Sequence, residues 1–90
     1  MRRATDPESD INALGIGFMR TEISLGLAFA NIASATSSDP QKRDRDRVNA
    51  QKAHDALCRF LPRLHLTNDD VAELHGGLER LRLAIAAVPI

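Results

Sequence analysis

Residues 11–32 read INALGIGFMRTEISLGLAFANI and place apolar side chains on two faces of a helix. At about 100° per residue, one stripe contains Ile11, Leu14, Phe18, Leu25, Phe29 and Ile32. A second stripe, well round the helix, contains Ile16, Met19, Ile23, Leu27 and Ala30. A surface helix of a small protein needs only one apolar face. We therefore expect other helices to cover this helix on two sides, and a second copy of the chain is one source of such cover.

The composition indicates a small protein of a reducing compartment. Its 90 residues suffice for one domain. Twelve basic residues balance twelve acidic ones, so no overall charge attracts nucleic acid or an anionic membrane. A single cysteine excludes an internal disulfide. Acidic residues precede the first apolar run, and Arg20 and Glu22 interrupt it, which weighs against a secretory signal. We expect a cytoplasmic protein with no membrane segment.

Helix-start and helix-stop signals divide the chain into three segments. Asp6-Pro7 and Asp39-Pro40 each place an N-cap residue before a proline at the first helical position. Pro62 ends or kinks the second helix, because a proline nitrogen cannot donate a hydrogen bond. Both connections are short, so consecutive helices should be antiparallel neighbours. We predict an all-α fold: an up-down-up three-helix antiparallel bundle over residues 11–90, completed by self-association, with an N-terminal tail over residues 1–10.

The third helix follows Thr67, which can cap its first turn. Its apolar residues alternate at spacings of three and four, as in a coiled-coil seam. They are Val71, Leu74, Leu78, Leu81, Ile85 and Val88. Gly76-Gly77 lies inside this pattern and either breaks the helix or allows close packing. In the first helix, small residues lie between the two apolar stripes and would let another helix approach. They are Gly15, Gly26 and Ala33.

Charge is segregated along the second half of the chain. Residues 42–63 contain seven basic and three acidic residues, whereas residues 69–79 contain four acidic residues and no Lys or Arg. These segments of opposite sign favour packing on one another. Four of the cations share one side of the second helix and could follow a phosphate backbone. They are Arg45, Lys52, Arg59 and Arg63. No aromatic residue stands ready for base stacking, so nucleic acid is the less favoured partner.

His54 and Cys58 lie four residues apart and share one helix face. This spacing can supply two zinc ligands or a Cys–His nucleophilic pair. No further pair is fixed nearby to complete four ligands, and no glycine-rich turn offers an oxyanion donor. We expect a half-buried thiol, no metal or cofactor, and no enzymatic activity.

The second stripe of the first helix is the candidate interaction surface. Its residues Ile16, Met19, Ile23 and Leu27 are joined by Leu83, which lies outside the seam of the third helix. Plain core is the alternative, if the second and third helices cover this stripe. We predict a non-catalytic protein–protein interaction module that self-associates through the first helix, with a homodimer favoured, or that binds another protein. The alternative function is a nucleic-acid-associated regulator that uses the four cations of the second helix.

Part of the chain resembles a tetratricopeptide-type helical hairpin. The residues that carry this resemblance are Leu25-Gly26, Phe29, Ala50, Ala53 and Leu57, which alternate small and large side chains. It covers Glu22 to Leu61, with a longer gap between the helices and without the opening tryptophan and closing proline pattern of that repeat. The resemblance implies a protein-binding helical module with no enzymatic activity. It also implies self-association, because a single unit of this kind cannot bury its own faces.

Overall fold

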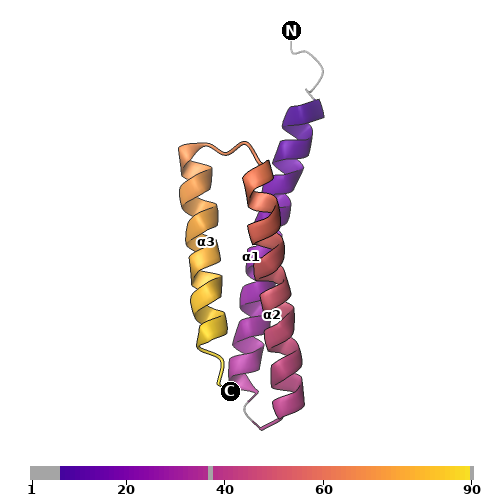
Figure 1. The fold of residues 1–90 in the computed structure, drawn as a ribbon, viewed down its shortest axis with the longest axis vertical. Helices are drawn as coiled ribbons and strands as arrows, with labels where there is room; N and C mark the ends of the chain where they lie inside the picture. The colour runs from indigo at the N-terminus through magenta and orange to yellow at the C-terminus, as the bar shows by residue number, and fades with distance from the viewer. Residues whose placement is uncertain (1–6, 37, 90) are drawn as a thin grey trace.

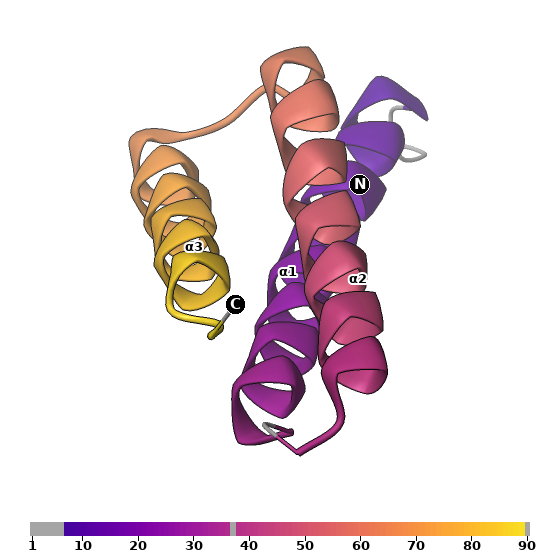
Figure 2. The same ribbon diagram turned by 60° about the horizontal axis from the view of Figure 1, so that its bottom comes forward.

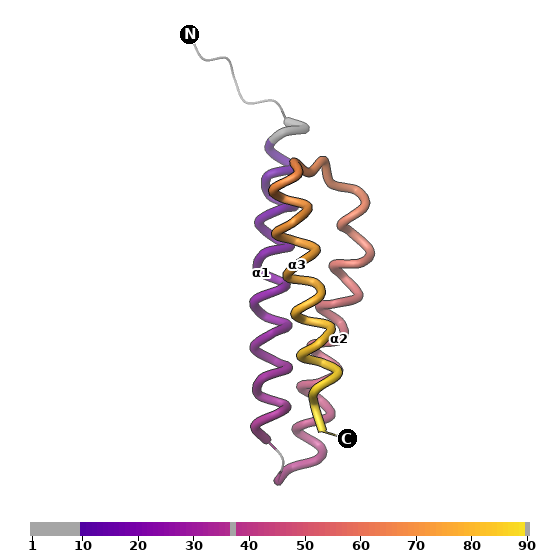
Figure 3. Tube along the Cα trace, turned by 90° about the vertical axis from the view of Figure 1, so that its left-hand side faces the viewer, coloured from indigo at the N-terminus to yellow at the C-terminus, as the bar shows by residue number. Residues whose placement is uncertain are grey.

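The protein is a three-helix bundle. The computed structural model describes residues 7–36 and 38–89, which form α1 (Pro7–Ala35), α2 (Pro40–Phe60) and α3 (Asn68–Ala86). A 3-10 turn, η1 (Leu61–Arg63), follows α2. The helices run alongside one another as a rod that is much longer than it is wide (Figure 1, Figure 3). The predicted all-α up-down-up bundle is confirmed, whereas its completion by self-association stays a prediction.

Side-chain caps determine where α2 and α3 begin. Asp39 accepts a hydrogen bond from the Lys42 amide at 3.1 Å, and Pro40 occupies the first turn of α2. The Thr67 hydroxyl accepts from the Asp70 amide at 3.0 Å, and the Asp70 carboxylate accepts from the Thr67 amide at 3.3 Å. This reciprocal capping box satisfies donors that the first turn of a helix leaves free. The predicted caps at Asp39 and Thr67 are confirmed.

The ends of the helices and the course of α3 bear on further expectations from the sequence. α1 begins at Pro7, the first helical position that the sequence indicates, and the tail expected over residues 1–10, which lies in part outside the described residues, stays a prediction. The expected cap at Asp6 lies outside the described residues. Pro62 ends α2 as predicted, and the chain continues as the short turn η1. In contrast, α3 runs without a break through Gly76-Gly77.

The inner face of α1, defined by Ile16, Met19, Ile23, Leu27 and Ala30, forms one wall of the hydrophobic core. Met19 is 1% exposed and Ile23 6%. They pack with Leu57 of α2 and with Leu74 and Leu81 of α3, all fully buried. The half-buried side chains around this cluster are Ile16, Leu27, Phe60, Leu64, Leu66, Leu78 and Ile85. Both α2 and α3 therefore cover the same stripe of α1.

Glycines allow the helices to approach closely. A Cβ at Gly26 would lie 2.9 Å from Leu81 Cδ2 and 3.1 Å from Ala53 Cβ. The Ala53 methyl cannot rotate away, so α1 meets α2 and α3 here only because residue 26 has no side chain. A Cβ at Gly77 would lie 2.6 Å from Ile23 Cδ1, so this glycine serves close packing. Figure 2 shows α1 and α2 as the tightly paired helices, with α3 to one side of the pair.

We predict that truncating a side chain destabilises the protein strongly on the inner face of α1 and hardly at all on its other stripe. Ile23→Ala removes a core side chain and should lower the free energy of unfolding by about 2–5 kcal/mol. Leu25→Ala truncates a side chain that is 46% exposed and should change the free energy of unfolding by no more than about 0.5 kcal/mol. Urea unfolding followed by circular dichroism measures both. Equal losses would contradict this assignment of core and surface.

A second pair of variants tests the close approach at Gly26. Gly26→Ala should destabilise the fold by about 1–3 kcal/mol, because the added methyl overpacks a tight contact. Gly17→Ala is the matched control in the same helix, since a Cβ there has no neighbour within 4 Å. It should stabilise the fold by up to about 1 kcal/mol through helix propensity. Thermal unfolding compares them, and a stabilised Gly26→Ala would show that the helices stand further apart.

Candidate interaction surface

The other stripe of α1 remains exposed, and we call it the outer row. Its members are Ile11, Leu14, Phe18, Leu25, Phe29 and Ile32. Ile11 is 69% exposed, Leu14 74%, Phe18 47%, Leu25 46% and Ile32 43%, whereas Phe29 is half-buried. Ile11, Phe18, Leu25 and Ile32 recur every seven residues, the spacing of a coiled-coil seam. Contiguous apolar surface of this kind marks interaction sites in soluble proteins.

The predicted interaction surface was placed on the inner face of α1, and this prediction is wrong. Met19 and Ile23 are buried, and Ile16 and Leu27 pack against the core. The physical reason is that α2 and α3 both lie on one side of α1, so the inner face is covered from within. Leu83 is 53% exposed, as expected. It follows the buried Leu81 by two residues, so it points away from the core and does not adjoin the outer row.

The outer row lies beside α2, on the side of α1 away from α3. The Phe18 and Phe60 rings pack edge to face with centroids 6.4 Å apart, which places this side of α1 against α2. On its other side, Arg20 of α1 pairs with Glu73 of α3 at 2.8 Å. Because the outer row and Arg20 flank α1 on opposite sides, α3 leaves the outer row uncovered.

Three cations of α2 and one of η1, which together we call the basic ridge, lie along the same surface. They are Arg45, Lys52, Arg59 and Arg63, all exposed. Arg63 stacks over the Phe60 ring, with 5.4 Å between guanidinium carbon and centroid. His54 and Arg82 line one cavity between α2 and α3. Lys52 precedes His54 by two residues, about 200° round the helix, so the ridge faces away from α3.

The antiparallel register brings the two rows level with one another. Gly26 lies opposite Ala53, and Gly15 lies opposite Leu64. Lys52 is therefore nearly level with Leu25. The basic ridge and the outer row run side by side along the α1–α2 pair.

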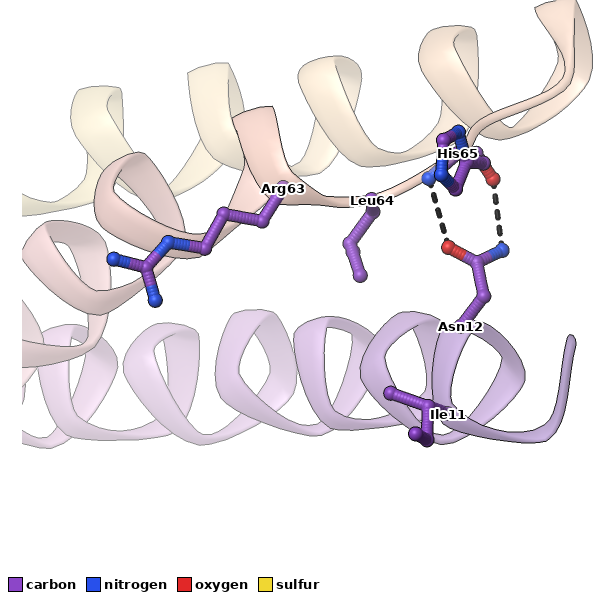
Figure 4. A pocket seen from close by; sticks show the side chains of 5 residues that line it. All are labelled: Ile11, Asn12, Arg63, Leu64 and His65. Atoms are coloured by element: carbon purple, nitrogen blue, oxygen red, sulfur yellow. Dashed lines mark hydrogen bonds between the residues drawn. The ribbon is translucent and has the colours of Figure 1, made fainter. Parts of the chain in front are cut away.

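A cavity of about 200 Å³ lies at one end of this surface, near the start of α1 (Figure 4). Its lining residues are Ile11, Asn12, Arg63, Leu64 and His65. The Asn12 amide donates to the His65 carbonyl at 2.8 Å, and the His65 amide donates to the Asn12 side-chain oxygen at 2.7 Å. This clamp holds the segment after α2 against α1 and so keeps Arg63 near Ile11. Sequence reasoning missed Asn12, since a lone asparagine within a helix gives no signal of such a contact.

Among the ion pairs of the described residues, none involves a cation of the basic ridge. Arg20 binds Glu73 and lies 3.8 Å from Asp70, and Arg82 binds Glu79 within α3 at 2.6 Å. The hydrogen bond from Arg20 lowers the pKa of Glu73, and the bond from Arg82 lowers the pKa of Glu79. Asp70 and Glu73 of α3 thus pair with α1, and Glu79 pairs within α3.

The expected pairing of the basic segment 42–63 with the acidic segment 69–79 is not found among the ion pairs of the described residues. Four of the seven cations form the ridge, which faces away from α3, and Lys42 pairs with Asp46 within α2 instead. Electrostatic contact between α1 and α3, through Arg20, takes its place.

His54 and Cys58 come together without further ligands. The Cys58 sulfur lies 3.7 Å from His54 Nδ1, and the thiol is exposed rather than half-buried as expected. Within residues 7–36 and 38–89, no group of three or more His, Cys, Asp or Glu side chains could hold a metal ion. A further histidine, His65, contacts Asn12 through its backbone and not through its ring.

Comparison of the chain with protein-family models, curated proteins and solved structures gives no match. The resemblance to a tetratricopeptide-type hairpin therefore stays a prediction. By length and composition alone, Asp10–Ala35 could cross a membrane, a property shared by core helices of soluble proteins and by signal sequences. Cytoplasmic location and the absence of a membrane segment also stay predictions.

The Arg20–Glu73 pair predicts a pH dependence of stability. The pKa of Glu73 lies below its ordinary value of 4.5 in the folded protein. The ionised Glu73 carboxylate therefore contributes fully to the free energy of unfolding above pH 4.5. This contribution is lost as the pH falls through the folded-state pKa. Arg20→Gln should lower the melting temperature at pH 7, and its difference from the parent should shrink as the pH falls below 4.5. Thermal scans between pH 3 and 7 test this, and a difference independent of pH would contradict it.

Proposed function

We propose that the protein is a non-catalytic helical interaction module that binds a protein partner through the outer row of α1. The observation that carries this proposal is the pattern of exposure along α1. The inner face alone completes the core, yet Ile11, Phe18, Leu25 and Ile32 keep between 43% and 69% of their surface in water. A helix that only had to fold would not need these side chains.

The shape of the outer row suits a macromolecular partner. From Ile11 to Ile32 it extends roughly 30 Å at 1.5 Å per residue. This is a long, narrow apolar strip rather than an enclosed pocket for a small molecule. The Asn12 amide, which lines the cavity at its end, is already hydrogen-bonded to the backbone of His65. The proposal therefore includes no catalytic step and no cofactor.

Nucleic-acid binding through the basic ridge is the second candidate function. The observation in its favour is that no ion pair of the described residues uses Arg45, Lys52, Arg59 or Arg63. Binding of this kind would fall steeply with salt and would not depend on Leu25. We favour the protein partner, because the apolar side chains beside the ridge have no role on a phosphate backbone.

Site-specific photo-crosslinking in living cells tests the proposed function. A photoreactive amino acid at Leu25 should yield a discrete protein adduct, which mass spectrometry identifies. The same amino acid at Leu83, which is apolar and similarly exposed on α3, should not. The identified protein should then bind the purified chain, and Leu25→Asp should weaken binding at least tenfold while Leu83→Asp leaves it unchanged.

Three results decide against or refine this proposal. No protein adduct at Leu25, or the same adducts at both positions, would overturn it. An adduct to nucleic acid would favour the second candidate function. An adduct between two copies of the chain would support the interaction module and identify the partner as the chain itself.

A further inference from the structure

We propose that the outer row and the basic ridge form one docking surface, called the groove below, for an amphipathic helix whose polar edge is acidic. This inference rests on the proposed function and specifies the chemistry of the partner. It joins two features that the sequence presents separately, an apolar stripe on α1 and a line of cations on α2.

The spacing of both rows fits a single helix lying along them. Ile11, Phe18, Leu25 and Ile32 repeat every seven residues on α1. Arg45, Lys52 and Arg59 repeat every seven residues on α2. A partner helix with a seven-residue repeat would meet both rows in register along its length. The groove length of roughly 30 Å corresponds to a partner helix of about 20 residues.

The charge of the groove determines which edge the partner needs. Four exposed cations line one side of the outer row, and the carboxylates beside it are the half-buried Glu22 and the exposed Asp10 at its start. Carboxylates repeated every seven residues along the partner would lie against Arg45, Lys52 and Arg59. Such flanking charges set partner choice and orientation in coiled coils. The apolar face of the partner would cover the outer row and exclude water.

A second copy of this chain fits the groove poorly. A two-fold axis across the helices pairs outer row with outer row, but it also places basic ridge against basic ridge. A two-fold axis along the helices places each ridge on the outer row of the other copy. Neither arrangement places a line of carboxylates along the ridge, because the described acidic residues beside the outer row are few, namely the half-buried Glu22 and the exposed Asp10. Like charges brought together disfavour the first pairing, and cations covered by apolar side chains without a carboxylate partner disfavour the second.

An anionic membrane surface also fits less well. Asp55 lies one helical turn before Arg59 and is exposed, and Asp44 is exposed on the same outer edge of α2. A flat membrane wide enough to meet the ridge would also meet these carboxylates, which it repels. A single helix in the groove contacts the ridge without covering that edge. We therefore favour a helical protein segment as the occupant.

Synthetic peptides test the partner chemistry directly. The probe is a 21-residue amphipathic helix with leucines on one face and glutamates repeated along one edge, and the control carries lysines in place of the glutamates. Calorimetry should show at least tenfold tighter binding of the glutamate peptide, with loss as salt is raised. Arg59→Glu should weaken that binding at least tenfold. Arg80→Glu, an equal charge change at an exposed site on α3, should leave it unchanged.

A charge-swap experiment adds a gain of binding to these losses. The double variant Lys52→Glu/Arg59→Glu should bind the lysine peptide at least tenfold better than the parent chain does. Circular dichroism should show that each variant keeps the helix content of the parent, as expected for exposed positions. A gain that depends on complementary charge cannot arise from damaged folding.

Several outcomes would overturn the inference. Equal binding of both peptides, lost in Leu25→Asp, would show that the partner needs no acidic edge. The proposed function would not be contradicted by this result. Binding of neither peptide by folded protein would reject the groove as a helix site. Binding to phosphatidylglycerol-containing vesicles, lost in Arg59→Glu, would assign the surface to a membrane. A concentration-dependent dimer dissolved by Leu25→Asp would assign it to a second copy. The photo-crosslinking experiment tests the proposed function separately, because the absence of a protein adduct at Leu25 would reject it.

Discussion

The packing of one face of α1 against both other helices is the contact on which the rest of the structure depends. Met19 and Ile23 form the core with Leu57, Leu74 and Leu81. Gly26 permits this arrangement, since even a methyl group there would collide with α2 and α3. With only two helices available, and both on the same side of α1, the outer row stays in water. The exposed surface is therefore a direct consequence of how the core is built.

The same packing places the basic ridge beside the outer row. The short connection between α1 and α2 makes them antiparallel neighbours, and the opposition of Gly26 and Ala53 sets their register. Phe60 contributes to both features, because it packs on Phe18 and carries Arg63 over its ring. The Asn12 clamp holds the far end of the surface together. One continuous surface combines the apolar stripe and the cations that otherwise suggest two different functions.

Local signals in the sequence were sufficient for the helices but not for the surface. Asp39 and Thr67 act as the caps that their positions indicated, because capping depends on neighbouring residues alone. The choice between the two stripes of α1 depends on tertiary packing, and both stripes carry similar side chains. One signal could have decided it. Gly26 lies about 60° from Ile23 and about 100° from Leu25 round the helix, so the stripe closer to the small residue is the one that another helix approaches.

Methyl NMR with a soluble gadolinium chelate measures most directly which stripe of α1 meets water. The chelate broadens signals of solvent-exposed methyl groups and spares buried ones. The account predicts strong broadening for Leu14, Leu25 and Ile32, and little for Ile23 and Leu81. Protection of Leu25 and Ile32 in the isolated protein would contradict it, because the outer row would then be covered without any partner.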